Sequence, residues 1–103
     1  MITVTRNGLS VKVKGHAQSA EYGKDLICAS ASILFYTLVE ALDRLQRDGK
    51  CKCEVKALEG DAEIKAISTD PTEVIQVINT IMIGYEILAE DYPENVKILL
   101  GVT

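Results

Sequence analysis

The chain has 103 residues, of which 48% are hydrophobic and only 5% aromatic, and its formal net charge is −4. A chain of this length forms one domain around a single core, so we expect residues 1–103 to make one domain with an aliphatic core. The net charge is negative and the basic residues are scattered along the chain, so the sequence predicts no basic surface that could bind a phosphate backbone. We therefore expect no direct binding of nucleic acid.

Export and membrane signals are not apparent in the sequence. The N-terminal MITVTRNG has no charged segment followed by an apolar one, so we expect no signal peptide. We also expect no stretch apolar and long enough to span a membrane. An odd number of cysteines without an export signal predicts free thiols in a reducing compartment. We therefore expect a cytoplasmic protein with no membrane partner.

The first 14 residues predict a β-hairpin. Apolar and polar residues alternate over residues 2–6 and 9–14, on either side of Asn7-Gly8, a dipeptide typical of a two-residue type I′ turn. The side chains expected to face the core are Ile2, Val4, Leu9, Val11 and Val13. Gly15 and His16 then follow where the second strand ends, and functional loops often start at such ends.

A helix and a second hairpin are predicted next. Apolar residues recur at helical spacing from about residue 25 to residue 48, with Asp25 as a candidate N-cap and Gly49 as the C-terminal stop. Two alternating strands follow over residues 51–58 and 62–68. The sequence Glu59-Gly60-Asp61 predicts the turn between them.

The sequence Asp70-Pro71-Thr72-Glu73 predicts the start of a second helix, with Asp70 as cap, Pro71 at N1 and Glu73 at N3. This helix should run to about Asp91. Its apolar residues cover more of the circumference than one sheet can bury, so we expect a homodimer that buries the spare face.

A last strand over residues 96–100 completes the order β-β-α-β-β-α-β. This order predicts an α+β fold. We expect a two-layer sandwich with both helices packed on one face of a mainly antiparallel or mixed sheet.

Cys28 and His16 are the candidate reactive groups. If Asp25 is the N-cap, Cys28 lies at N3, where free N–H groups and the positive helix end stabilise a thiolate. His16, the only histidine, can serve as its general base, and the same N–H groups can hold an oxyanion. The alternative is that Cys28 is a small buried residue and His16 an ordinary polar residue.

Asp25 and Ser32 are candidate supporting residues. The Asp25 carboxylate can orient His16, or it can simply cap the helix. Ser32 lies one turn after Cys28, where its hydroxyl can support the site or bond back to the Cys28 carbonyl.

Cys51 and Cys53, together with Cys28 and His16, provide four potential zinc ligands. The alternation of the strand, however, places Cys51 and Cys53 on one face with Val55 and Ala57, which favours small core residues. We therefore expect no metal ion and no cofactor.

The segment Gly15-His16-Ala17, followed by Gly23, Asp25, Cys28, Ala29 and Ser32, resembles the signature of the ribosomal-processing cysteine protease family, also called the Prp or YsxB-like family. The likeness extends in outline over the whole chain. It implies a cytosolic, homodimeric bacterial endopeptidase. Such an enzyme removes a short N-terminal extension from the precursor of large-subunit ribosomal protein L twenty-seven, cutting after a pair of aromatic residues.

The resemblance also implies roles for individual residues. His16 and Cys28 match the catalytic pair, and Gly15, Asp25 and Ser32 match supporting positions. We expect the polar segment before the helix to form a mobile loop over the site; it comprises Ala17, Gln18, Ser19, Ala20, Glu21, Tyr22, Gly23 and Lys24. Two alternatives stay open, namely a non-enzymatic ribosome-assembly or peptide-docking module of the same fold, and a zinc-binding domain.

Overall fold

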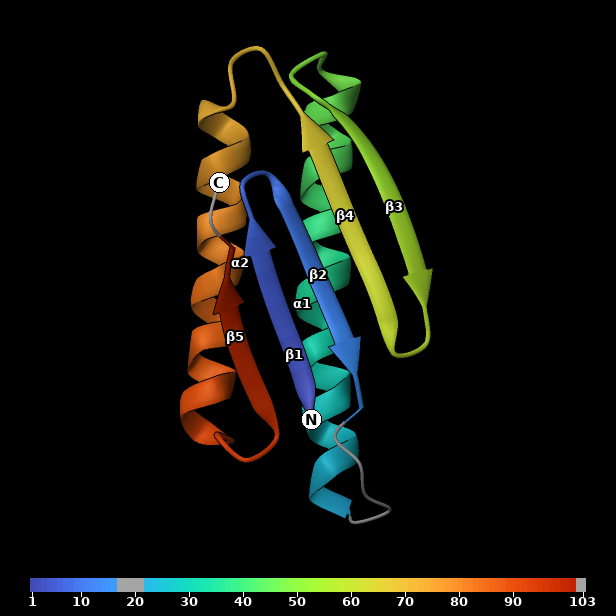
Figure 1. Ribbon diagram of the computed structural model, residues 1–103. Coiled ribbons are helices and arrows are strands. Elements are labelled where there is room, and N and C mark those ends of the chain that lie inside the picture. Colours follow the sequence, from blue (N-terminus) through green and yellow to red (C-terminus); the bar gives the residue numbers. More distant parts are fainter. Residues whose placement is uncertain (17–21, 102–103) are drawn as a thin grey trace.

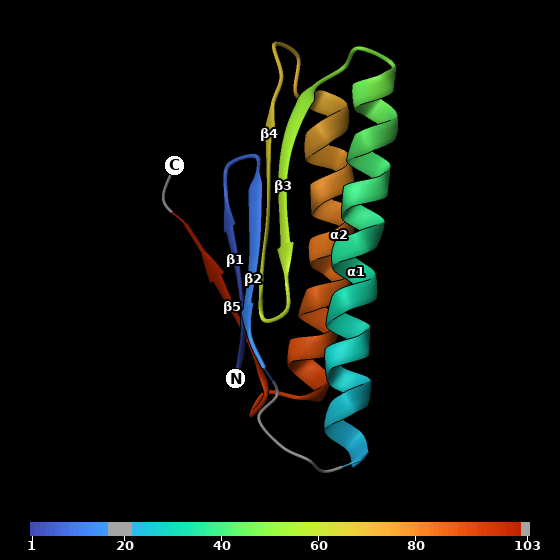
Figure 2. The same ribbon diagram turned by 90° about the vertical axis from the view of Figure 1, so that its right-hand side faces the viewer.

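The computed structural model describes residues 1–16 and 22–101, with the backbone alone for residues 22–25. Five strands form one sheet: β1 (Ile2–Asn7), β2 (Ser10–Gly15), β3 (Lys52–Leu58), β4 (Asp61–Ile67) and β5 (Val96–Leu100). The helices α1 (Tyr22–Arg47) and α2 (Thr72–Asp91) lie side by side (Figure 1) on the same face of this sheet (Figure 2). The predicted α+β sandwich and its element order are confirmed.

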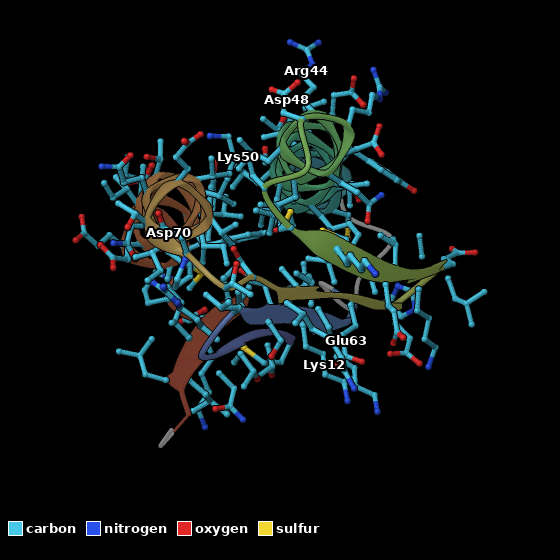
Figure 3. The ribbon with its side chains drawn as sticks, turned by 90° about the horizontal axis from the view of Figure 1, so that it is seen from above. Lys12, Arg44, Asp48, Lys50, Glu63 and Asp70 are labelled. Atoms are coloured by element: carbon cyan, nitrogen blue, oxygen red, sulfur yellow. The ribbon has the colours of Figure 1, made fainter. Side chains whose placement is uncertain are left out.

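The strands are arranged in the order β3-β4-β2-β1-β5. Only β1 and β5 pair in parallel, and the other three pairs are antiparallel, so the sheet is mixed. Because β2 pairs with β4, with Lys14 opposite Asp61, the end of β2 lies beside the turn between β3 and β4. Viewed from above, Lys12 and Glu63 lie on the sheet face opposite the helices (Figure 3).

The turn of the first hairpin lies one residue further along the chain than predicted. Asn7 pairs with Ser10, so the two turn residues are Gly8 and Leu9 and not Asn7 and Gly8. Gly8 supplies the positive φ of 61° at the first turn position, which leaves Asn7 free to pair. The predicted alternation holds, since Ile2, Val4 and Val11 are buried.

The first helix begins earlier than predicted. Because α1 starts at Tyr22, Asp25 is not its N-cap, and Tyr22, Gly23 and Lys24 are helical and not part of a loop. An aspartate favours a cap but does not stop a helix, and no proline interrupts this turn. The remaining predicted loop residues, 17–21, lie outside the described residues.

The second helix begins one residue later than predicted. Pro71 is the N-cap, with a ψ of 9°, and the helix runs over Thr72–Asp91. Asp70 still caps in a chemical sense, because its carboxylate accepts hydrogen bonds from the Thr72 N–H at 3.3 Å and the Thr72 hydroxyl at 2.8 Å. These bonds lower the pKa of Asp70.

By length and composition alone, Leu26–Arg47 of α1 is apolar enough to cross a membrane, contrary to the expectation from sequence. In this fold, however, the helix buries one apolar face, formed by Ile27, Ala31, Phe35, Leu38 and Leu42. The spacing of three and four residues is that of a core helix. Ion pairs join Glu40 to Arg44 and Asp43 to Arg47 on its exposed side.

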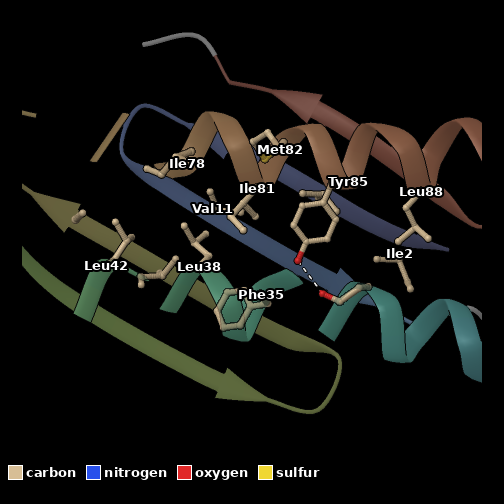
Figure 4. Close-up of a cluster of buried hydrophobic side chains, with 14 of the residues drawn as sticks. Ile2, Val11, Phe35, Leu38, Leu42, Ile78, Ile81, Met82, Tyr85 and Leu88 are labelled. Atoms are coloured by element: carbon tan, nitrogen blue, oxygen red, sulfur yellow. Dashed lines mark hydrogen bonds between the residues drawn. The ribbon is translucent and has the colours of Figure 1, made fainter. Parts of the chain in front are cut away.

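The core fills the space between the sheet and the helices (Figure 4). Tyr85 of α2 is its largest fully buried side chain, and the tyrosine hydroxyl donates a hydrogen bond to the Ala31 carbonyl of α1 at 2.8 Å. Burial raises the pKa of Tyr85, so the hydroxyl remains a donor. The bond joins the two helices close to Cys28.

Replacing Tyr85 by phenylalanine removes this bond and keeps the ring. We expect Tyr85→Phe to lower the free energy of unfolding by about 1 kcal/mol, measured by urea denaturation. The matched control is Tyr92→Phe, which changes an exposed tyrosine and should alter stability by less than about 0.5 kcal/mol. Equal losses in both variants would contradict the role of the buried bond.

Candidate active site

The backbone at His16 is fixed from two sides at the end of β2. The Gly15 N–H donates to the Gly60 carbonyl at 2.9 Å, and the Met1 amino group donates to the His16 carbonyl at 2.6 Å. These contacts tie the end of β2 to the β3–β4 turn and to the start of β1. His16 itself is exposed.

Gly15 has a structural reason to be glycine. Its φ is +103°, which a side chain rarely tolerates. A Cβ there would lie 3.3 Å from the Met1 carbonyl carbon and closer still to the carbonyl oxygen. Gly15 therefore determines the path of the backbone immediately before His16.

Cys28 lies in the second turn of α1, because the helix starts at Tyr22. The prediction that it occupies N3 is wrong, and with it the prediction of free N–H groups beside the sulfur. An amide in the second turn has an acceptor inside the helix, and the influence of the dipole falls off within the first turn. Cys28 is half-buried and packs against the core.

The structure brings Cys28 and His16 to the same end of the molecule, where β2 ends and α1 begins (Figure 1). No hydrogen bond joins the Cys28 thiol to the His16 ring, both of which are described. The ring lies instead against Gly60, where a Cβ would be 2.8 Å from His16 Cε1 and 3.2 Å from Cδ2. The predicted dyad is therefore not assembled in this orientation of the histidine.

The described contacts do not test the supporting roles predicted for Ser32 and Asp25. Ser32 is exposed one turn after Cys28, and between these two described residues no bond from the hydroxyl to the Cys28 carbonyl is formed. Of Asp25, the structure describes only the backbone within α1. The roles of both residues therefore stay predictions.

Cys51 and Cys53 belong to the core, as predicted. Cys51 is buried, its thiol donates to the Leu42 carbonyl at 3.6 Å, and its sulfur lies 3.7 Å from that of Cys53. Burial, followed by the hydrogen bond to Cys51, raises the pKa of Cys53 to about 12. Among the described side chains of residues 1–16 and 26–101, no three His, Cys, Asp or Glu residues are grouped so that they could hold a metal ion.

Gly60 is the contact of His16 that sequence analysis missed. The sequence predicts Gly60 only as a turn residue, and its contact with the histidine depends on the pairing of β2 with β4. Many strand orders are compatible with the same local pattern, so the sequence carries no direct signal for this contact.

The similarity to known proteins covers nearly the whole chain. A family model described as cysteine protease Prp matches residues 1–97. A ribosomal processing cysteine protease Prp from Staphylococcus aureus is 28% identical over 99 residues, covering 94% of this chain and 92% of that protein.

Solved structures show the same similarity. An essential ribosomal processing protease Prp from S. aureus, in complex with a covalently linked product peptide, matches with a TM-score of 0.83 and 26% identity, covering 98% of this chain and 100% of that one. The structure of SMU.848 from Streptococcus mutans matches with a TM-score of 0.69 and 31% identity, covering 97% and 93%. The fold of this chain is therefore that of the Prp structures.

The three thiols should react with iodoacetamide in a fixed order at pH 7.5. We expect Cys28 first, because Cys51 is buried and Cys53, with a pKa of about 12, is almost entirely protonated. The rates at Cys51 and Cys53 should be at least about a hundredfold lower, as measured by peptide mapping with mass spectrometry. In 8 M urea, about the concentration that unfolds most small domains, the three rates should converge; a faster Cys53 in the folded protein would contradict this order.

Proposed function

This chain belongs to the cysteine protease Prp family, and we propose that it removes the short N-terminal extension of the precursor of large-subunit ribosomal protein L twenty-seven. The chemistry is that of a cysteine protease. The proposed cleavage lies after a pair of aromatic residues, as the sequence resemblance implies. The covalently linked product peptide in the S. aureus relative is the observation that best supports peptide cleavage through a cysteine.

The proposed mechanism uses Cys28 and His16 as a dyad. His16 removes the thiol proton, and the Cys28 sulfur forms a bond to the scissile carbonyl carbon. The carbon–nitrogen bond then breaks as His16 returns the proton to the leaving amine. Water hydrolyses the thioester and restores the thiol. In this proposal Gly15, Asp25 and Ser32 support the pair.

The His16 ring lies against Gly60 and makes no hydrogen bond to the described Cys28 thiol, so in this proposal the ring moves when the dyad forms. Since hydrogen bonds hold the backbone at both Gly15 and His16, rotation of the side chain is the simplest movement that can bring the imidazole toward Cys28. Binding of the peptide can drive this rotation if the substrate interacts better with the dyad orientation.

A homodimer is the second part of the proposal. The outer faces of both helices expose large aliphatic and aromatic side chains, with Ile33 and Tyr36 on α1 and Ile83 and Ile87 on α2, each more than half exposed. Residues three and four apart share a helix face, and the two helices are neighbours (Figure 2). An apolar surface of this kind is typical of a subunit interface.

The proposed location is the cytoplasm. The three cysteines are free thiols in the structure, which suits a reducing compartment.

The test of the proposed activity is mass spectrometry of a peptide that spans the extension and the cleavage site. Wild-type protein should cut it once, after the aromatic pair, and Cys28→Ser should leave it intact. We expect His16→Ala to lower kcat by at least about a hundredfold, because the thiol loses its general base. The matched control is Cys51→Ser, which alters a thiol outside the proposed dyad. A peptide that binds to the wild type without being cut would favour the docking module.

The test of the dimer is the mass in solution by light scattering. Ile83→Glu and Ile87→Glu should shift a wild-type dimer toward monomer, because a charge cannot be buried unpaired in an apolar interface. The control is Ile67→Glu, which changes an even more exposed isoleucine that lies on β4 rather than on a helix. A wild-type monomer, or a dimer lost only in the control, would contradict the proposed interface.

A further inference from the structure

The contact between His16 and Gly60 involves the far edge of the imidazole. The ring atoms nearest to the position of a Cβ at residue 60 are Nε2, then Cε1 at 2.8 Å and Cδ2 at 3.2 Å. Nε2 lies between the other two in the ring, so this edge is directed at the turn. The ring occupies the space that a side chain at residue 60 would need.

The backbone cannot easily move to avoid such a side chain. The Gly60 carbonyl accepts the Gly15 N–H at 2.9 Å, and Gly15 in turn pairs with Ile2 in β1. The His16 carbonyl is held by the Met1 amino group. A group larger than hydrogen at residue 60 would therefore displace the imidazole rather than the strand.

The His16 imidazole packs against the β3–β4 turn but forms no ion pair with the described residues of that turn. The neighbouring Asp61 carboxylate is paired with Lys56 Nζ at 2.6 Å, and among the ion pairs of the described residues none involves His16. Packing against Gly60 is the contact of the exposed ring that the described residues show.

From these contacts we propose that Gly60 is a positioning residue for His16, which holds the imidazole against the β3–β4 turn in a resting orientation that makes no hydrogen bond to the described thiol of Cys28. The proposal rests on the proposed dyad of these two residues. Residue 60 then determines the balance between the resting and the dyad orientations, and a side chain there shifts that balance toward the dyad.

Nuclear magnetic resonance can detect the contact in the unmodified protein. Because the chain has a single histidine, its ring protons are assigned without ambiguity. We expect nuclear Overhauser effects from His16 Hε1 and Hδ2 to the Gly60 α-protons in the peptide-free protein. Their absence would overturn the proposal, whatever the variants show.

The matched pair of variants is Gly60→Ala and Gly49→Ala. Both glycines have a similar positive φ, +72° and +76°, but a Cβ at residue 49 would meet no atom within 4 Å. The two substitutions thus impose similar backbone strain, and only the first displaces His16. Folding of both is checked by circular dichroism.

The readout is the rate of Cys28 alkylation by iodoacetamide without peptide. We expect Gly60→Ala to raise this rate about tenfold over Gly49→Ala, the change that follows when a dyad population near 10% becomes dominant. Adding His16→Ala to Gly60→Ala should abolish the increase. Equal rates in Gly60→Ala and Gly49→Ala, or an increase that persists without His16, would contradict a role acting through the histidine.

Failure of this proposal and failure of the proposed function give different results. If the alkylation rate rises as expected but the wild type cuts no precursor peptide, the substrate is wrong and the role of Gly60 stands. If the wild type cuts the peptide and the Overhauser effects are absent, the activity stands and the resting orientation is wrong.

Discussion

The packing of α1 against α2 around Tyr85 is the interaction on which the rest of the structure depends. A phenol that is completely buried must find an acceptor, and the Tyr85 hydroxyl finds one in the Ala31 carbonyl of α1 (Figure 4). That bond fixes the relative position of the helices within the same stretch of α1 that carries Cys28. The depth at which the thiol sits above the sheet is therefore a consequence of core packing.

His16 is positioned by a different part of the molecule. Its backbone follows directly after β2, where the Met1 amino group holds the His16 carbonyl and the β3–β4 turn holds the preceding Gly15, whereas Cys28 belongs to the helical layer. With the two candidate reactive groups on separate layers, the orientation of the histidine side chain can change while both backbones stay in place. The histidine can then occupy a resting position without any change in the fold.

The division of the fold into one sheet layer and one helical layer explains why the outer faces of the helices expose so much apolar surface. A two-layer fold buries one face of each helix, and the opposite faces of α1 and α2 have no third layer to cover them. The isoleucines there cost little in stability, but they are a strong reason to expect association.

Local sequence patterns were enough to predict the strands, both helices, the fold class and the two candidate reactive residues. Alternation at period two and recurrence at period 3.6 are local properties of the chain, so they survive in any tertiary arrangement. Capping residues predicted the first residue of each helix less accurately. Asp25 has the chemistry of an N-cap but lies inside α1, and Asp70 lies one residue before the observed cap, because several neighbouring residues can start a helix at similar free energy.

The strand order, and with it the contact between Gly60 and His16, depends on long-range pairing that the sequence does not show. Pairing of β2 with β4 brings together residues 44 positions apart in the chain, and no local pattern encodes which strands become neighbours. The orientation of the imidazole depends on that contact and on the missing Cβ of a glycine. The sequence thus points to the two groups of the proposed dyad, while the distance between them is a property of the packed layers.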